Sequence, residues 1–205
     1  FNFFVPLKNN PLLAKRLIEN AFGIACSSIK EILIEYAPDP KEAYLDDRTS
    51  FDAFITYLHP QHGLSGIGIE VKYTEGKYRI GKTEKEKVEN HQSSYWKMTR
   101  TSGVFQDGGD PTLASDSLRQ IWRNHLLGLS MVQQNEIHHF TSIILFPLGN
   151  KHYRRAIPKY QSLLKEDYHS QVRGCSYRKF IDSIDGNNEI LRWKEYLHNR
   201  YLVNQ

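Results

Sequence analysis

Two runs of alternating apolar and polar residues stand close together in SFDAFITYLHPQHGLSGIGIEVKYTEGK, residues 50–77. Alternation with a period of two is typical of β-strands, because successive side chains point to opposite faces of a sheet. The short connection between the two runs contains Gly, His and Pro. FDAFITYL and IGIEVKY therefore predict two neighbouring antiparallel strands, and a β-sheet is the first element of the expected fold.

The rest of the chain alternates between helical and strand-like patterns. HHFTSIILFPL is the most apolar strand pattern, so it is expected in the centre of the sheet. The stretch from 74 to 92 is polar and is interpreted as solvated, and FQDGGDPT as a loop. The expected elements are a helix at 11–22, strands near 29–36, 52–58 and 66–74, a helix at 112–133, a strand at 138–147, a basic helical region at 150–165 interrupted near Pro158, and a closing helix carrying Ile190, Trp193, Leu197 and Tyr201.

The composition is that of a globular protein with one substantial core: 205 residues, of which 40% are hydrophobic and 24% charged. No repeat or low-complexity linker divides the chain, so a single α/β domain over 1–205 is expected, with 76–111 as an insertion or loop region. No apolar run reaches the length of a membrane span, and FNFFVPLKNN lacks the parts of a secretory signal. The chain starts at Phe1 rather than Met, so further residues are expected before it.

The two cysteines and the net charge restrict the setting of the protein. Cys26 and Cys175 are far apart and belong to no paired motif, so two reduced thiols in a cytoplasmic protein are expected rather than a disulfide. The formal net charge of +4 is compatible with a polyanionic partner but does not identify one.

Charged residues interrupt the two predicted strands at three positions. Residues two apart in a strand share a face, so Glu70 and Lys72 emerge side by side. Antiparallel pairing brings Asp52, at the start of the first strand, close to Glu70. Charged groups in strands are costly unless they are paired, solvated or bound to something. Two carboxylates and one ammonium group are therefore expected to share one place.

This trio suits the hydrolysis of phosphodiesters with a divalent cation. Carboxylate oxygens are ligands that Mg²⁺ prefers, and the cation polarises a phosphodiester and stabilises the leaving oxygen. A neighbouring lysine can orient or deprotonate the attacking water and neutralise charge on phosphorus. The alternative is structural, with Asp52 and Glu70 salt-bridged to Arg48 and Lys72 at the strand edge.

The Glu-x-Lys motif alone carries little information, because a chain of this length contains roughly one by chance. This chain contains two copies, at 70–72 and 75–77. Only the first lies within a period-two apolar frame and follows an Asp-bearing strand at hairpin distance. The context rather than the motif favours the catalytic interpretation.

FDAFITY followed by GIGIEVKYTE resembles the Asp…Glu-x-Lys signature of the PD-(D/E)xK nuclease superfamily. The resemblance implies a restriction-endonuclease-like core, an α-β-β-β-α-β order with a mixed central sheet flanked by helices. The expected elements match this order, with an insertion after the third strand and extra C-terminal helices. FNFFVPL, EYAPDPKEAYLDDRTSFDAF, IEVKYTE and IWRNHLLG together resemble a bacterial family described as restriction endonucleases, and this narrower resemblance spans most of the chain.

The superfamily pattern implies a role for each residue of the trio. It makes Asp52 and Glu70 metal ligands, with the Val71 carbonyl as a third, and it makes Lys72 the catalytic lysine. One departure is that Ser-Phe, rather than the usual Pro, precedes the aspartate.

Many members of the superfamily add an acidic residue upstream of the signature. Glu19, on the first predicted helix, and Glu35, on the first predicted strand, are the two candidates. Glu35 is favoured because it adjoins the EYAP block of the narrower resemblance.

Four arginines are candidates for binding phosphates of a nucleic acid. Arg119 and Arg123 lie one turn apart on the predicted long helix, and Arg154 and Arg155 belong to a basic cluster in the next helical region. A solvated face is the alternative for each pair.

HQSSY and the histidines are weaker signals. Gln92 and Tyr95 resemble a Gln-Tyr motif of some nucleases in the superfamily, but the spacing differs and a solvated helix start is favoured. The histidines at 59, 62, 138 and 139 lack the spacing of a zinc site, so no zinc is expected.

Together, the residues and the resemblance predict a Mg²⁺-dependent deoxyribonuclease, with Mn²⁺ able to substitute, that acts as a restriction-type or repair-type endonuclease. Target recognition would need a homodimer, a partner subunit or the region 76–111. Two alternatives stay open: a nuclease-like DNA-binding module without turnover, and an interaction subunit of a larger assembly.

Overall fold

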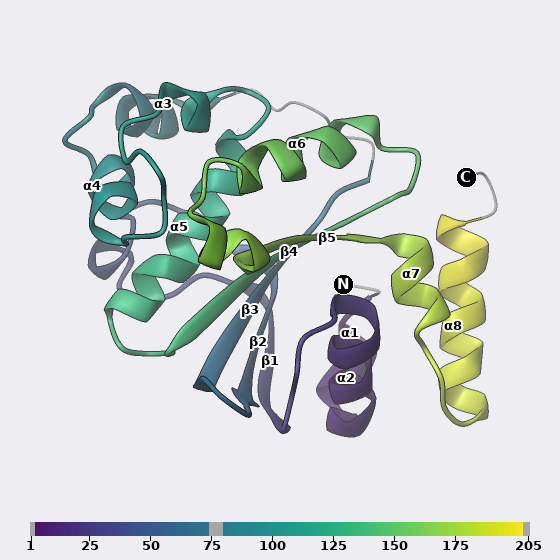
Figure 1. Cartoon of the computed structure of the whole chain (residues 1–205). Helices are drawn as coiled ribbons and strands as arrows, with labels where there is room; N and C mark the ends of the chain where they lie inside the picture. Colours follow the sequence, from purple (N-terminus) through teal and green to yellow (C-terminus); the bar gives the residue numbers. More distant parts are fainter. Residues whose placement is uncertain (1–2, 74–79, 203–205) are drawn as a thin grey trace.

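A mixed five-stranded sheet forms the centre of the fold (Figure 1). The structure is a computed structural model and describes residues 3–73 and 80–202. The strands lie side by side in chain order; the second is antiparallel to both the first and the third, and the last two run parallel to the third. They are β1 (Ser28–Tyr36), β2 (Phe51–His59), β3 (Gly63–Val71), β4 (His139–Phe146) and β5 (Val172–Ser176).

Helices cover both faces of the sheet (Figure 1). The predicted α/β class and the predicted order of helix, three strands, helix and strand are confirmed. One face packs against the helices at the two ends of the chain, which are α1 (Val5–Lys8), α2 (Pro11–Leu17), η1 (Ile18–Phe22), α7 (Tyr177–Asp182) and α8 (Asn188–Tyr201). The other packs against α3 (Lys82–Glu89), α4 (Ser94–Thr101), α5 (Arg119–Gln133) and α6 (Lys151–Gln161), with short turns η2 (Lys41–Ala43), η3 (Pro111–Ala114) and η4 (Glu166–Gln171).

Alternation along the strands separates two apolar cores. Ile55 and Ile69 belong to the first core, which lies beneath the terminal helices. Phe54, Phe140 and Ile144 belong to the second core, which lies beneath α5. Burying each such side chain contributes about 1.5–3 kcal/mol to folding. Because both faces are covered, the period-two pattern of the hairpin fixes which residues can reach the second core.

Three glycines leave room for aromatic rings in the core between the sheet and α5. Gly66 and Gly68 lie on the α5 side of β3, where a Cβ would collide with Phe54 or Phe51. Gly128 on α5 has the same role, because a Cβ there would collide with the ring of Phe140. The close packing brings polar residues of α5 within reach of the end of β3.

The stretch 74–92, expected to be solvated, is mostly exposed over its described residues, although Glu84 is buried. Two helices that the sequence did not predict, α3 and α4, form in the region 80–111, and Tyr95 and Trp96 of α4 are fully buried. Trp96 packs on Trp122 of α5 with ring centroids 4.7 Å apart. These aromatic residues anchor the region 80–111 to the second core, so it is more than a loop. The first part of the predicted insertion, 76–79, lies outside the described residues.

The C-terminal third also differs from the expectation in two ways. The short strand β5 was not predicted, because VRGCS has no apolar run. Helix α6 continues through Pro158, which lies in its last turn, although the proline cannot donate a hydrogen bond to the carbonyl of Arg154. The long helix expected from 112 begins only at Arg119, after the 3₁₀ turn η3.

Across the two described ranges, every helix falls short of the length and apolar character that a membrane-crossing segment requires.

Candidate active site

The antiparallel hairpin brings together the carboxylate–lysine trio, by which we mean Asp52, Glu70 and Lys72. Ala53 pairs with Ile69, so Asp52 and Glu70 are the next residues along the two strands. Asp52 Oδ2 accepts a hydrogen bond from the Val71 N–H at 2.6 Å. Lys72 Nζ contacts Glu70 Oε1 directly. The predicted meeting of two carboxylates and one ammonium group is therefore present.

The backbone that carries Lys72 is fixed by its neighbours on both sides. The Lys72 N–H donates to the Leu145 carbonyl at 2.8 Å, which extends the pairing of β3 with β4 past the end of the strand. The Tyr177 hydroxyl donates to the Lys72 carbonyl at 2.6 Å. Only 9% of the Lys72 side chain is exposed, so its ammonium group is held against Glu70 rather than in solvent.

Two amides of α5 hold the Glu70 carboxylate from the other side. Gln120 Nε2 donates to Glu70 Oε1 at 3.0 Å, and Asn124 Nδ2 donates to Glu70 Oε2 at 2.7 Å. Residues 120 and 124 are one turn apart, so both face the end of β3. The Tyr153 hydroxyl of α6 donates to Gln120 Oε1 at 3.3 Å. Sequence reasoning missed these three residues, because their approach depends on how α5 and α6 pack.

Burial raises the pKa of the Glu70 carboxyl group, and the charge on Asp52 raises it further. The positive charge of Lys72 and the hydrogen bonds from Lys72 and Asn124 act in the opposite direction. A buried carboxylate beside a second carboxylate is stabilised by additional positive charge. The electrostatics of this place therefore favour the binding of a cation.

The structure separates the two candidates for an upstream acidic residue. Glu35 lies between Ile34, which pairs with Ala53, and Tyr36, which pairs with Phe51, so its register position is next to Asp52. Glu35 is exposed and adopts φ +52°, a left-handed conformation that is uncommon outside glycine.

Glu19 lies toward the other end of the sheet. It forms an ion pair with Lys15 at 3.1 Å, and Lys15 Nζ donates to the Cys26 carbonyl at 2.6 Å. Cys26 precedes the start of β1, where Ser28 pairs with Leu58 near the end of β2. Asp52 stands at the beginning of β2, so the geometry favours Glu35 over Glu19.

The residues at this place fit a Mg²⁺ ion, which binds through one or two carboxylates and keeps several waters. The exposed Asp52 and the buried Glu70 supply the carboxylates. Asn124 Oδ1 is a buried acceptor without a hydrogen-bond partner, and it adds an oxygen of suitable chemistry nearby. Within the described ranges, no three His, Cys, Asp or Glu side chains gather to form a complete protein cage.

The expectation that Arg119 contacts phosphates requires a correction. Arg119 is 3% exposed and forms ion pairs with Glu84 at 3.1 Å and with Asp116 at 2.7 Å. Glu84 also pairs with Arg123 at 3.1 Å. Helix α3 covers this side of α5, so Arg119 belongs to a buried ionic network. Arg123 is partly exposed and stays a candidate.

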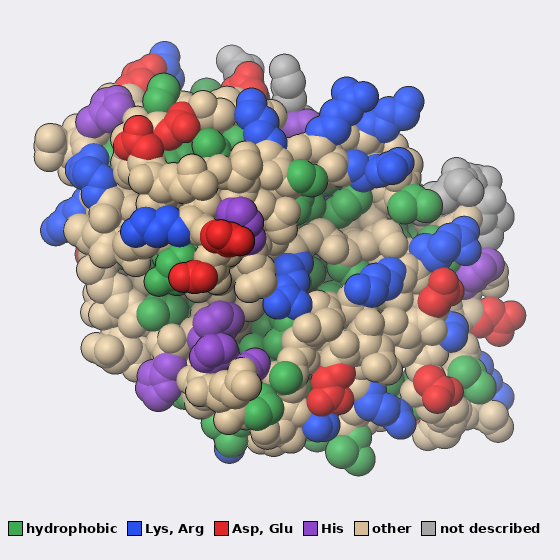
Figure 2. All heavy atoms as spheres, in the orientation of Figure 1, with side chains coloured by type: hydrophobic (Ala, Val, Ile, Leu, Met, Phe, Trp, Pro, Cys, Tyr) green, Lys and Arg blue, Asp and Glu red, His purple; other side chains and the backbone are tan. Residues whose placement is uncertain are grey.

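Basic side chains gather on the outer face of α6, as Figure 2 shows. Arg154 and Arg155 are exposed and line a groove of about 320 Å³ together with Lys151. A second groove beside it, of about 280 Å³, includes Lys159. Tyr153 of the same helix donates to Gln120 of α5, and Gln120 donates to Glu70 of the trio. The predicted basic cluster and the trio are therefore parts of one region.

Gln92 and Tyr95 do not join this region. Tyr95 is buried and its hydroxyl contacts Asp47, so a solvated helix start is wrong for this residue. The histidines of the β2–β3 connection and β4 stack on one another instead, with His59–His62 and His62–His139 ring centroids 4.4 and 4.6 Å apart. They lie at the end of β2 and the start of β4, away from Asp52.

Comparison with known proteins gives one match. A family model described as the PD-(D/E)XK nuclease superfamily matches residues 1–203, which is nearly the whole chain. No curated protein and no solved structure matches this chain.

Proposed function

Since the chain belongs to the PD-(D/E)XK nuclease superfamily, we propose that it is a Mg²⁺-dependent nuclease that hydrolyses phosphodiester bonds of DNA. The observation that carries this proposal is the trio itself. Asp52 accepts a hydrogen bond from the N–H of Val71, the residue between Glu70 and Lys72. The Glu70 carboxylate is held by Lys72 and by the side-chain amides of Gln120 and Asn124. Such a preorganised carboxylate pair with an adjacent ammonium group serves phosphodiester hydrolysis.

In this proposal Asp52, Glu70 and the Val71 carbonyl hold the cation, and Mn²⁺ can replace Mg²⁺. The bound cation supplies positive charge to the phosphodiester and to the leaving oxygen. Lys72 orients or deprotonates the attacking water, and Glu35 completes the acidic set at the end of β1. Lys72 also fixes the position of the Glu70 carboxylate through direct contact.

The proposed DNA surface includes Arg154 and Arg155 on α6, with Arg123 beside the trio. The grooves along α6 support it, because phosphate contacts from exposed basic side chains position a duplex without reading its sequence. We propose a restriction-type or repair-type endonuclease that gains target specificity from a homodimer or a partner subunit. The buried free thiols of Cys26 and Cys175 fit a protein of the reducing cytoplasm.

A cleavage assay tests the proposal. Supercoiled DNA, linear DNA and RNA are each incubated with the protein with and without Mg²⁺ or Mn²⁺. Lys72→Ala and Asp52→Asn are compared with Lys8→Ala, which alters an exposed lysine of α1. Metal-dependent cutting of DNA that both site variants abolish and Lys8→Ala retains is the expected result. Uncut DNA that is nevertheless bound with a steep salt dependence would favour the alternative of a binding module without turnover.

A further inference from the structure

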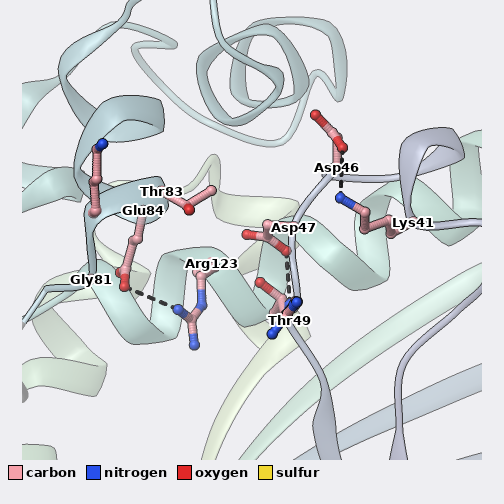
Figure 3. A pocket seen from close by; sticks show the side chains of 10 residues that line it. Lys41, Asp46, Asp47, Thr49, Gly81, Thr83, Glu84 and Arg123 are labelled. Atoms are coloured by element: carbon pink, nitrogen blue, oxygen red, sulfur yellow. Dashed lines mark hydrogen bonds and ion pairs between the residues drawn. The ribbon is translucent and has the colours of Figure 1, made fainter.

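A polar cleft of about 580 Å³ opens between the loop that precedes β2 and the start of α3 (Figure 3). We call it the Arg48–Lys82 cleft. No motif in the sequence indicates it, because its walls come from four separate segments. The residues that line it are Lys41, Asp46, Asp47, Arg48, Thr49, Gly81, Lys82, Thr83, Glu84 and Arg123.

The cleft is adjacent to the trio through two elements. Arg48 and Thr49 stand directly before β2, three to four residues ahead of Asp52. Arg123 precedes Asn124, whose side chain holds Glu70 at 2.7 Å. The same two elements therefore contribute residues to the trio or its supports and to the Arg48–Lys82 cleft.

Two of the three carboxylates of the cleft are neutralised by cations. Asp46 pairs with Lys41 at 3.3 Å and with Lys87 at 3.4 Å. Glu84 pairs with Arg123 at 3.1 Å, as Figure 3 shows, and with Arg119 on its other side. These ion pairs reduce the repulsion that the two carboxylates exert on an anion.

The third carboxylate is committed to hydrogen bonds. Asp47 Oδ1 accepts from the Thr49 N–H at 2.8 Å, and Oδ2 contacts the Tyr95 hydroxyl. Asp47 thereby fixes the turn that presents Arg48. Its two oxygens are both occupied by donors from the protein.

Two cations of the cleft keep their charge for a ligand. Arg48 and Lys82 are exposed, and within the described ranges neither forms an ion pair or a side-chain hydrogen bond. They come from two different elements that line the cleft, one from the loop before β2 and the other from the first turn of α3. An anion bound in the cleft is attracted by both positive charges.

The chemistry of the lining selects a phosphate backbone over a base. Among the described lining residues there is no aromatic ring, so a nucleobase finds no surface on which to stack. Arginine and lysine bind phosphate through charge-assisted hydrogen bonds. The cleft also lies apart from the basic grooves of α6, which Lys151, Arg154 and Arg155 line.

We propose that the Arg48–Lys82 cleft binds the phosphodiester backbone of DNA next to the bond that is cut. This inference rests on the proposed nuclease function for its ligand. Arg48 and Lys82 contact one or two consecutive phosphates, while the grooves of α6 contact other phosphates of the same duplex. The backbone is thereby held at more places than the reacting phosphate.

The test compares two double variants that remove the same charge. Arg48→Ala/Lys82→Ala alters the cleft, whereas Lys85→Ala/Lys97→Ala alters exposed lysines of α3 and α4 outside its lining. Affinity for a short DNA duplex is measured by fluorescence anisotropy without divalent cations, over a range of salt concentrations. The cleft variant is expected to show a slope of log affinity against log salt that is shallower by about 1.8, or 0.9 for each lost phosphate contact. The control variant should retain the original slope.

A second measurement does not depend on DNA cleavage. Inorganic phosphate is titrated into the protein, and NMR follows the backbone N–H signals of Thr49 and Thr83. Saturable shifts that the cleft variant loses, and that Arg48→Lys/Lys82→Arg restores, support the site even if the protein cuts no DNA. An unchanged salt slope in the cleft variant, or equal losses in both double variants, would overturn the proposal while leaving the nuclease function intact.

Discussion

The carboxylate of Asp52 accepts a 2.6 Å hydrogen bond from the backbone N–H of Val71. Val71 is the middle residue of the Glu-x-Lys motif, so this bond joins the start of β2 to the end of β3 at the motif itself. It holds an exposed carboxylate toward the buried one without any bound ligand. The trio is thus preorganised by the hairpin, and a cation need not reorder the strands to bind.

Asp52→Asn separates the charge of this residue from its hydrogen bond. Asn offers Oδ1 to the same N–H, so the free energy of unfolding should change by no more than about 0.5 kcal/mol. Losing one of two carboxylates should remove about 3–4 kcal/mol of transition-state stabilisation, which lowers single-turnover cleavage by two to three orders of magnitude. Cleavage with saturating DNA and Mg²⁺ measures the effect. A rate equal to that of the unaltered protein would show that Asp52 is no metal ligand.

Asn124 and Gln120 should matter through the position of Glu70. Asn124→Ala and Gln120→Ala each remove one donor from the carboxylate, which should weaken Mn²⁺ binding by about 10–100-fold. Gln133→Ala, at the exposed end of the same helix, is the matched control. Electron paramagnetic resonance of free Mn²⁺ gives the affinity without any cleavage. If both variants bind Mn²⁺ as tightly as the control, the amides serve packing alone.

The period-two pattern of the hairpin was enough to predict that Asp52, Glu70 and Lys72 meet. Residues of paired strands have fixed neighbours, so sequence spacing translates directly into proximity. The amides that hold Glu70 lie 50 and 54 positions further along the chain. Their approach depends on how α5 packs against the sheet, with Gly128 directly over the Phe140 ring, and no local pattern contains that information.

Arg119 shows why helical periodicity alone misleads. It occupies a polar position of an amphipathic helix, which predicts a solvated side chain. In the fold, α3 lies over that position and supplies Glu84 as its partner. The helix that covers Arg119 lies in a stretch that the sequence predicts to be solvated, because α3 has few apolar residues of its own. The same lack of an apolar run concealed β5.

The ionic network around Glu84 should be essential for stability. Glu84 is 7% exposed and pairs with both Arg119 and Arg123, so Glu84→Ala leaves Arg119 buried with fewer partners. Breaking a buried pair in this way costs about 3–5 kcal/mol of unfolding free energy. Glu86→Ala, on the exposed face of α3, should change it by less than about 0.5 kcal/mol. Urea unfolding compares the two variants, and similar midpoints would contradict the buried network.

His125 should make the protein less stable in mild acid. It is fully buried, with Nδ1 3.0 Å from the Tyr160 hydroxyl and Nε2 3.2 Å from Gln171 Oε1. Burial lowers its pKa from 6.5 to about 4. As the pH falls below 6.5, the unfolded chain therefore takes up a proton that the folded protein refuses. The contribution of neutral His125 to the free energy of unfolding is fully present above pH 6.5, and it is lost as the pH falls toward 4.

The size of this loss can be measured with His125→Phe, which does not titrate. From pH 7 to pH 4.5 the unaltered protein should lose about 2–3 kcal/mol more unfolding free energy than the variant, at 1.36 kcal/mol for each pH unit below 6.5. His139, whose pKa burial also lowers to about 4, is common to both proteins and cancels in the comparison. His198→Gln, an exposed change on α8, should keep the full loss. Equal losses in the unaltered protein and His125→Phe would mean that His125 accepts a proton inside the folded core, which its two hydrogen bonds and full burial argue against.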